Sequence, residues 1–406
     1  MRICLYTTIT AARENLPRLR APWRAFKDAV KRARDQARWT LSNDRAFDFN
    51  AWSTATDTNR GDMAIRHAVR MQLAEQFGPT TDFLEVPWGE LTAATIAEIN
   101  ATCDLFVISG GGYLFIEEDG SLGNKRLAAD IPFLKMIRCP RVAYAIGLNQ
   151  VLPHGAAAPP AFNSAAAAVL REWLSALELV SARDEPTAAL LRQIDQTRCP
   201  VIGDPALFLK TARSGGTRNG RVGINFAVHG QLSQALFSRN FFVYRDMLRH
   251  LERQGLTLDY VIHSDIDPVA VRMFRREGIR LGVIDVPAPA LVDAYAGLDF
   301  VVCQMLHSAI LASAAGVPSV NIAYDRKNFA FYDLLGMPAQ CIGHAEYSGE
   351  WLDGRLSALR SERPSMVEHL TARKQALHDG QREVLRQIAE ILSCHQTPRL
   401  TQSSGT

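Results

Sequence analysis

The stretch that decides the fold runs from Leu298 to Lys327 and reads LDFVVCQMLHSAILASAAGVPSVNIAYDRK. An apolar run over 298–302 precedes a polar cluster, and the small residues over 308–315 have the composition of a packed helix. A Gly-Val-Pro turn then leads to a second apolar run, 319–324. Strand, helix and strand in this order form the repeating unit of a parallel sheet. The polar cluster follows the first strand, at the edge where open α/β sheets bind ligands.

The same alternation of strand and helix patterns extends outward in two blocks. Between the blocks, residues 210–221 are rich in Arg, Ser, Gly, Thr and Asn, as expected of a linker. We therefore predict an α/β protein with two doubly wound, Rossmann-like domains facing a cleft. The N-terminal domain is predicted over 1–209 and the C-terminal domain over 222–345. C-terminal helices over 346–393 and a loose tail over 394–406 complete the chain.

A basic insertion over 12–50 interrupts the first block. Between Ala12 and Trp39, nine Lys or Arg accompany three acidic residues, and Trp23 and Phe26 have helical spacing. One interpretation is an interfacial helix or lid that makes peripheral contact with a membrane carrying an anionic glycolipid. The alternative is a solvated basic helix beside the core.

The overall composition is that of an ordinary globular protein. A net charge of +3 over 406 residues is too small to indicate a nucleic-acid partner. Seven scattered cysteines, none in a CxxC pair, fit free thiols in a reducing compartment and argue against a structural zinc site. The start, Met1–Tyr6, is too short for a signal peptide, and no apolar run is long enough to span a membrane. We expect a cytoplasmic protein, with the inner face of the membrane as a further option, and leave the oligomeric state open.

Polar groups collect at the predicted strand ends of both blocks and suit an anionic small molecule and a hydroxyl-rich acceptor. The candidate binding residues are Asn59, Asp62, Gly110, Gly111, Gly112, Arg183, Gln304, Ser308 and Lys327. The three glycines follow a buried strand, where they would expose amide donors to a ligand or simply form a tight turn. His307 is the candidate acid/base because imidazole titrates near neutrality. Cys303 has no activating group nearby in the sequence, and we interpret it as a small residue at the edge of the core.

The order of several short motifs resembles that of the polysaccharide pyruvyl transferase family over about residues 50–340. The motifs are Asn59-Arg-Gly-Asp62, Ser109-Gly-Gly-Gly112, Ala143-Tyr-Ala-Ile-Gly147, Ala182-Arg-Asp184, Gly203-Asp-Pro-Ala206, Leu306-His307, Gly316-Val-Pro318 and Tyr324-Asp-Arg-Lys327. The resemblance implies a GT-B-like fold and transfer of a pyruvyl group from phosphoenolpyruvate to a saccharide or lipid-linked sugar in surface (exo)polysaccharide biosynthesis. It implies a pyruvate ketal as product, phosphate release, and no metal or redox cofactor. His307 matches the family's histidine, and Arg183, Lys327 and backbone amides would hold the donor.

One position departs from the family's usual Gly-x-Arg-Leu-His pattern. This chain has Cys303-Gln-Met-Leu-His307, so that Met305 stands where an arginine is expected to meet the anionic donor. Loss of a charge-assisted contact costs about 1.5–3 kcal/mol. Two alternatives therefore remain open: a GT-B-like glycosyltransferase that uses a nucleotide sugar, and a non-catalytic relative that binds an anionic glycan. The sequence has no P-loop, HExxH motif, nucleophile elbow or GxGxxG motif, and the absence of GxGxxG argues against a dinucleotide cofactor.

Overall fold

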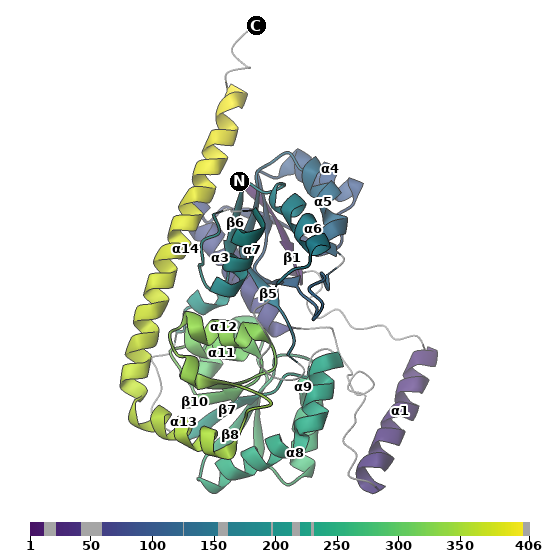
Figure 1. Ribbon diagram of the computed structural model, residues 1–406, viewed down its shortest axis with the longest axis vertical. Helices are drawn as coiled ribbons and strands as arrows, with labels where there is room; N and C mark the ends of the chain where they lie inside the picture. The colour runs from purple at the N-terminus through teal and green to yellow at the C-terminus, as the bar shows by residue number, and fades with distance from the viewer. Residues whose placement is uncertain are drawn as a thin grey trace.

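The structure is a computed structural model. It describes residues 1–11, 22–41, 59–124, 126–152, 161–195, 198–212, 220–228 and 231–400. Two parallel sheets, each covered by helices, lie one above the other in Figure 1, and the longest helix runs along both. This layering follows from the alternation of strands and helices along the chain. Each helix returns the chain to the end of the sheet where the next parallel strand begins, and it packs on a face of the sheet.

The N-terminal sheet has its strands in the order β2-β1-β3-β5-β6, with β4 continuing β3 alongside β5. The strands are β1 Arg2–Thr7, β2 Asp82–Pro87, β3 Leu105–Ile108, β4 Gly111–Phe115, β5 Arg141–Asn149 and β6 Leu179–Ala182. The helices around it are α3 Arg60–Phe77, α4 Ala93–Thr102, α5 Arg126–Met136, α6 Ser164–Leu174 and α7 Glu185–Asp195. All strand pairs are parallel, and β3 is buried along its whole length, as expected of a strand covered on both faces.

The C-terminal sheet has the order β12-β11-β10-β7-β8-β9, again with all strands parallel. Its strands are β7 Arg221–Asn225, β8 Thr257–Val261, β9 Leu281–Ile284, β10 Phe300–Cys303, β11 Ser319–Ala323 and β12 Cys341–Gly343. Its helices are α8 Gln231–Arg253, α9 Asp267–Arg276, α10 Leu291–Ala296, α11 Leu306–Ala314, α12 Arg326–Leu334, α13 Gly349–Ser361 and α14 Arg363–Leu400. This is the doubly wound Rossmann order, whose direction reverses between β7 and β10.

One hydrophobic cluster joins the two domains. It contains Leu5 and Val107 from the N-terminal sheet, Val301 from the C-terminal sheet, and Val384 and Ile388 from α14. Helix α14 begins in the C-terminal domain and runs back along the N-terminal domain (Figure 1). Two parallel α/β domains that face each other in this way form a GT-B-like architecture, as predicted.

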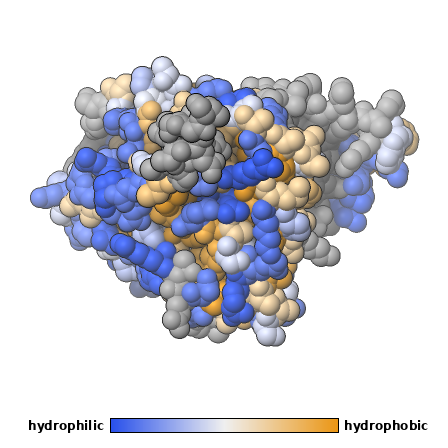
Figure 2. All heavy atoms as spheres, turned by 90° about the horizontal axis from the view of Figure 1, so that it is seen from above, coloured by the Kyte–Doolittle hydropathy of each residue, from blue (hydrophilic) through white to orange (hydrophobic). Residues whose placement is uncertain are grey.

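Helix α1, Pro22–Leu41, lies within the predicted basic insertion, whose parts at 12–21 and 42–58 are outside the described residues. It stands apart from the two sheets (Figure 1). Seen from above, the described part of this projection, at the right, is largely hydrophilic, whereas hydrophobic residues gather toward the middle (Figure 2).

Three expectations from the sequence need correction. Helices α5 and α12 were not predicted; Pro132 within α5 has the character of a helix breaker, but here it is accommodated. The predicted tail is helical up to Leu400, since Ser393 donates to the Ala389 carbonyl and the His395 ring contacts the Arg138 carbonyl at 3.0 Å. The triple glycine lies partly within β4 and does not form an open loop.

Candidate active site

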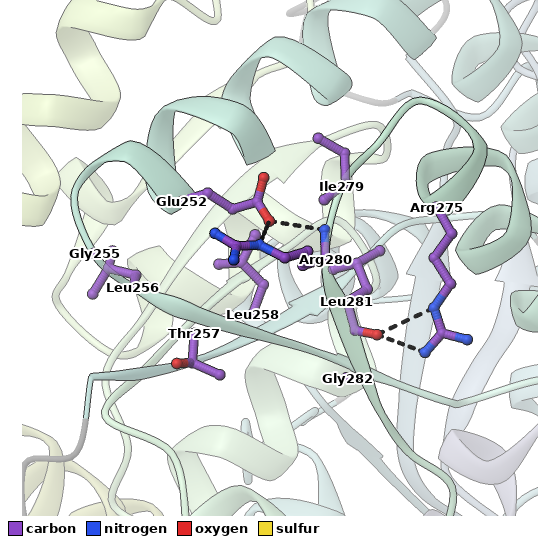
Figure 3. Close-up of a pocket in the computed structure, with 10 residues that line it drawn as sticks. All are labelled: Glu252, Gly255, Leu256, Thr257, Leu258, Arg275, Ile279, Arg280, Leu281 and Gly282. Atoms are coloured by element: carbon purple, nitrogen blue, oxygen red, sulfur yellow. Dashed lines mark hydrogen bonds and ion pairs between the residues drawn. The ribbon is translucent and has the colours of Figure 1, made fainter.

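Two of the hollows beside the C-terminal sheet lie at opposite ends of its strands. One, of about 550 Å³, lies where β8 and β9 begin, and Glu252 and Arg280 pair across it (Figure 3). The other, of about 480 Å³, lies beyond the carboxyl ends of β10 and β11, between the two domains. Ligands of doubly wound sheets bind at the carboxyl ends of the strands, at the point where strand order reverses. The second hollow is therefore the candidate active site.

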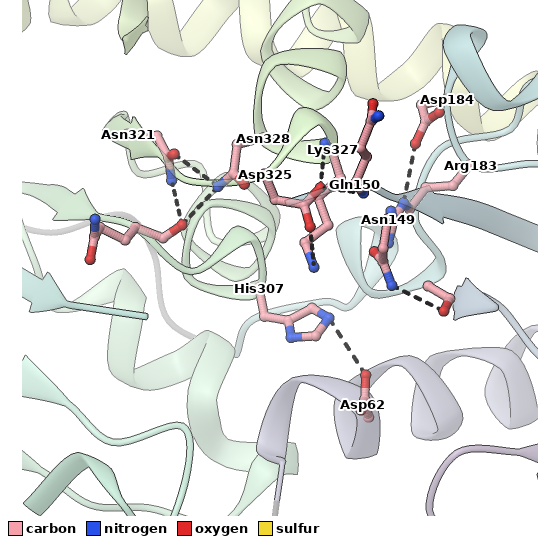
Figure 4. A network of polar contacts seen from close by, with 12 residues as sticks. Asp62, Asn149, Gln150, Arg183, Asp184, His307, Asn321, Asp325, Lys327 and Asn328 are labelled. Atoms are coloured by element: carbon pink, nitrogen blue, oxygen red, sulfur yellow. Dashed lines mark hydrogen bonds and ion pairs between the residues drawn. The ribbon is translucent and has the colours of Figure 1, made fainter. Parts of the chain in front are cut away.

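Two walls enclose this cavity, and Figure 4 shows the polar contacts around it. The N-terminal wall consists of Asn59, Phe115, Asn149 and Val151. The C-terminal wall consists of Ala227, Leu232, Ser233, Met305, Leu306, His307, Tyr324, Asp325 and Lys327. Apolar side chains such as Phe115, Leu232 and Met305 thus share the cavity with an imidazole and an ammonium group.

His307 lies in the first turn of α11, and its ring meets the first turn of α3. The distance from His307 Nε2 to Asp62 Oδ1 is 3.7 Å (Figure 4). A Cβ atom on Gly61 would overlap the His307 ring, so only glycine permits this close approach. The carboxylate on one side and the bare backbone on the other fix the orientation of the imidazole.

Asn59 organises the start of α3. Its Oδ1 accepts from the Gly61 amide at 3.1 Å, and its Nδ2 donates to Asp62 Oδ2 at 2.9 Å. The side chain therefore caps the helix and at the same time holds Asp62 toward His307. Asn59 is thus the cap of α3, and Asp62 lies within the first turn of the helix.

Lys327 faces the cavity from the first turn of α12. Its Nζ lies 3.7 Å from Asp325 Oδ2 and 5.7 Å from the centre of the Tyr324 ring. Burial opposes the charged form, but Tyr324 and Asp325 outweigh it and raise the pKa of Lys327. Asp325 also caps α12 and accepts from the Gln150 amide at 3.1 Å, which ties the end of β5 to this wall.

Of the helices α3, α11 and α12, which begin at the cavity, only α11 lacks a side-chain cap. Asn59 caps α3 and Asp325 caps α12, whereas Met305, at the corresponding position of α11, makes no capping hydrogen bond. An N-terminus without a side-chain cap presents backbone donors and the positive end of the helix dipole. The start of α11, with His307 in its first turn and Lys327 nearby, can therefore accommodate an anion.

Besides the glycines, three predicted binding residues are buried and do not line the cavity. Gln304 donates to the Tyr244 hydroxyl at 2.7 Å and accepts from the Ala227 amide at 3.3 Å. Ser308 lies 3.2 Å from the ring of buried His263. The turn before α11 directs these two side chains into the core, where their hydrogen bonds hold the turn in place.

Arg183 is the third of these residues. It is covered by Gly147, where a Cβ atom would come within 2.5 Å of the guanidinium group, and its closest carboxylates are Asp184 at 3.4 Å and Asp204 at 3.7 Å. It lies beneath the end of β5, near Asn149 and Lys327, without reaching the cavity (Figure 4). Its charge therefore acts on the site only through space.

The triple glycine, for which the sequence left open either amide donors to a ligand or a tight turn, has a packing role and does not line the cavity. A Cβ atom on Gly110 would lie 3.0 Å from the Ala145 carbonyl, and the Gly112 carbonyl accepts from Asn149 Nδ2 at 3.1 Å. Close contact between β4 and the bulged strand β5 explains the need for glycine. This contact also holds Asn149 at the cavity.

Cys303 is buried at the end of β10, and burial raises the pKa of its thiol to about 12. A thiolate nucleophile is therefore not available there at neutral pH. Within the described ranges, no group of three or more His, Cys, Asp or Glu side chains is arranged to hold a metal ion. None of the described helices is long and apolar enough to cross a bilayer.

Comparison with solved structures finds distant similarity. A mutant form of the O-GlcNAc transferase of Thermobaculum terrenum is 17% identical, with a TM-score of 0.44, over 98% of this chain and 69% of that one. MnaA of S. aureus, solved with UDP, is 10% identical, with a TM-score of 0.48, over 77% of this chain and 88% of that one. A mutant form of TarM of S. aureus is 11% identical, with a TM-score of 0.46, over 74% of this chain and 58% of that one.

No curated protein matches this sequence. The family model described as polysaccharide pyruvyl transferase matches residues 59–326, from the cap of α3 to the first residue of α12. The match covers well over half of the chain and includes the residues of both walls of the cavity except Lys327. This chain belongs to the polysaccharide pyruvyl transferase family.

Proposed function

We propose that this protein transfers a pyruvyl group from phosphoenolpyruvate to two hydroxyls of a saccharide, free or lipid-linked. The two hydroxyl oxygens become bonded to C2 of the donor, the C2–O bond to phosphate breaks, and the methylene becomes a methyl group. One hydroxyl proton is accounted for by the methyl group and the other by the released hydrogen phosphate. Charge balances, since the trianionic donor yields a monoanionic ketal and a dianionic phosphate.

The observation that carries this proposal is the start of α11. A helix without a side-chain cap, His307 in its first turn and Lys327 on the same wall together provide positive potential and a titratable group at one place. The phosphate and carboxylate of the donor need the positive potential, and the methylene carbon needs a proton donor. Met305 adds no charge, so donor binding rests on Lys327 and the backbone of α11.

The residues around the cavity have distinct roles in this reaction. His307 in its imidazolium form donates a proton to the methylene carbon and, once neutral, accepts one from the second attacking hydroxyl. Asp62 is a positioning residue, because it contacts the imidazole at 3.7 Å and stabilises its charged form. Asn59 and Asn149 provide amide groups for sugar hydroxyls, and the apolar side chains Phe115 and Leu232 reduce the access of water.

The test is an assay of phosphate release from phosphoenolpyruvate with a panel of saccharides, with the ketal methyl group detected by NMR. Wild-type protein should release phosphate only when an acceptor is present. His307→Ala should lower the rate about a hundred- to ten-thousandfold, the range for loss of an acid/base group. The melting temperature and donor binding of the variant should stay close to those of the wild type.

Two results would contradict the proposal. Binding of nucleotide sugars without binding of phosphoenolpyruvate would favour the glycosyltransferase alternative. Binding of an anionic glycan, with no turnover of any donor across the panel, would favour a non-catalytic glycan-binding protein.

A further inference from the structure

Helix α1 carries an unusual group of exposed apolar side chains. Trp23, Phe26 and Val30 are 62%, 71% and 54% exposed, more than any other large hydrophobic residue in the described part of the chain. Their spacing of three and four residues places them within an arc of about 60° on one face of the helix. Single exposed apolar residues are normal, but a cluster of them on a protein surface is typical of an interaction site.

Basic side chains border this apolar face. Lys27, Lys31, Arg34 and Arg38 are all exposed and follow one another at intervals of four, three and four residues. They form a stripe directly beside the apolar residues, and Lys27 Nζ lies 4.8 Å from the centre of the Trp23 ring. The exposed face of α1 thus combines apolar and cationic groups.

The acidic side chains of α1 lie elsewhere. Asp28 and Asp35, seven residues apart, occupy a different side of the helix and are 8% and 0% exposed. Arg34 pairs with Asp35 at 3.2 Å, and Arg34 is itself exposed, as are Lys27, Lys31 and Arg38. The exposed face therefore carries positive charge without exposed carboxylates, although the helix contains both signs.

We infer that α1 docks the protein onto a lipid bilayer that contains anionic headgroups. Aromatic and aliphatic side chains would enter the boundary between headgroups and acyl chains, and the lysines and arginines would contact lipid phosphates. Charge complementarity selects this partner over a second copy of the chain, because two copies would bring two basic stripes together. In the described part of the chain, α9 contacts α1 through a hydrogen bond from Arg276 to Gln36, which lies on another side of the helix from the apolar and basic residues.

Docking of α1 would also determine where the domain that carries the cavity is located. In the chain α1 lies between β1 and α3, and the first turn of α3 carries Asn59 and Asp62. A membrane-bound α1 would keep this domain at the surface where lipid-linked saccharides are found. The docking itself requires nothing of the chemistry proposed for the cavity.

The experiment is co-sedimentation of the full-length protein with phosphatidylcholine vesicles, with and without phosphatidylglycerol. Wild-type protein should bind the anionic vesicles, and the binding should weaken as salt is added. Lys27→Glu/Lys31→Glu should reduce partitioning by at least about thirtyfold, the product of two lost cation contacts. Trp23→Ser/Phe26→Ser should also release the protein, with less dependence on salt.

Matched controls lie on other parts of the surface. Met136→Ser removes an exposed apolar residue of α5, and Arg280→Glu reverses an exposed charge before β9; both should bind as the wild type does. Circular dichroism and melting curves should show all variants folded, and phosphate release with a soluble acceptor should be unchanged in the α1 variants. That last readout separates failure of docking from failure of the proposed reaction.

The inference is overturned if wild-type protein ignores anionic vesicles, or if the two α1 double variants bind them like wild type. It is also overturned if wild-type protein is a dimer that Trp23→Ser/Phe26→Ser converts to a monomer without any vesicle binding. In that case the exposed face of α1 joins two copies of the chain.

Discussion

The two walls of the cavity are built in different ways. The C-terminal wall rests on buried amides: Asn328 donates to the Gln304 carbonyl at 2.7 Å and to Asn321 Oδ1 at 2.9 Å. The N-terminal wall depends instead on backbone shape, with the bulge in β5 at Ala145, where φ is +53°, and the glycine approach at Gly61. The reactive groups His307 and Lys327 therefore sit on the braced wall, and the N-terminal wall positions them.

The largest effect should come from breaking the contact between the walls. Gly61→Ala places a methyl group where the His307 ring lies, so the ring must move. A displacement of about 1 Å can lower a rate about a hundredfold. Turnover of Gly61→Ala should fall by that order while donor binding changes little, as measured by phosphate release and calorimetry.

Gly354→Ala is the matched control, since a Cβ atom at this position of α13 meets nothing within 4 Å. It should keep full activity, and alanine in a helix should stabilise it slightly. Equal activity of the two variants would show that the walls do not depend on the Gly61–His307 contact.

Donor affinity should depend on the ammonium group of the C-terminal wall. Lys327→Met keeps the length of the side chain but removes its charge, which should weaken phosphoenolpyruvate binding about ten- to a hundredfold. Calorimetric titration measures the effect, and Lys135→Met, which removes an exposed lysine paired with Glu172, is the control. Unchanged affinity in Lys327→Met would move the anion to another part of the cavity.

Sequence patterns predicted the scaffold better than the direction of its side chains. The strand–helix–strand unit around His307 depends on local apolar runs, and these are visible in the sequence. Whether a polar residue after a strand faces the cavity depends on the turn, and Gln304 and Ser308 face the core instead. The bulge in β5, which brings Asn149 to the cavity, is likewise not visible in any local sequence pattern.

Acid should weaken the C-terminal wall through His263, which lies behind α11. Its ring contacts the Tyr295 hydroxyl at 2.7 Å and Ser308, and burial, assisted by Arg60, lowers its pKa to about 3. Above the unfolded-state pKa of about 6.5, His263 is neutral in both the folded and the unfolded chain, so it causes no loss of stability there. As pH falls from about 6.5 toward 3, only the unfolded chain takes up the proton, which costs about 1.4 kcal/mol per pH unit.

The measurement is the unfolding free energy from urea titrations between pH 7 and pH 4. Burial raises the pKa of Asp267 to about 7, which acts in the opposite direction, but this contribution is present in wild type and variant alike. His263→Asn should therefore lose stability at pH 7 and show less further loss in acid than wild type. His395→Asn, near the end of α14, should keep the wild-type slope; an identical slope in His263→Asn would contradict this account.

The smallest effect should come from Arg60, which joins the walls from outside the cavity. Its guanidinium donates to the carbonyls of Ile262 at 3.2 Å and Val286 at 2.8 Å, and pairs with Asp285 at 2.5 Å. Because the ion pair is partly exposed, Arg60→Ala should cost about 1–2 kcal/mol of unfolding free energy. Arg280→Ala, whose side chain is 91% exposed, should cost close to nothing. If Arg60→Ala also raises the KM for the donor, the guanidinium group helps to set the spacing of the two walls. If stability falls but KM does not change, the shared hydrophobic core and α14 set that spacing without Arg60.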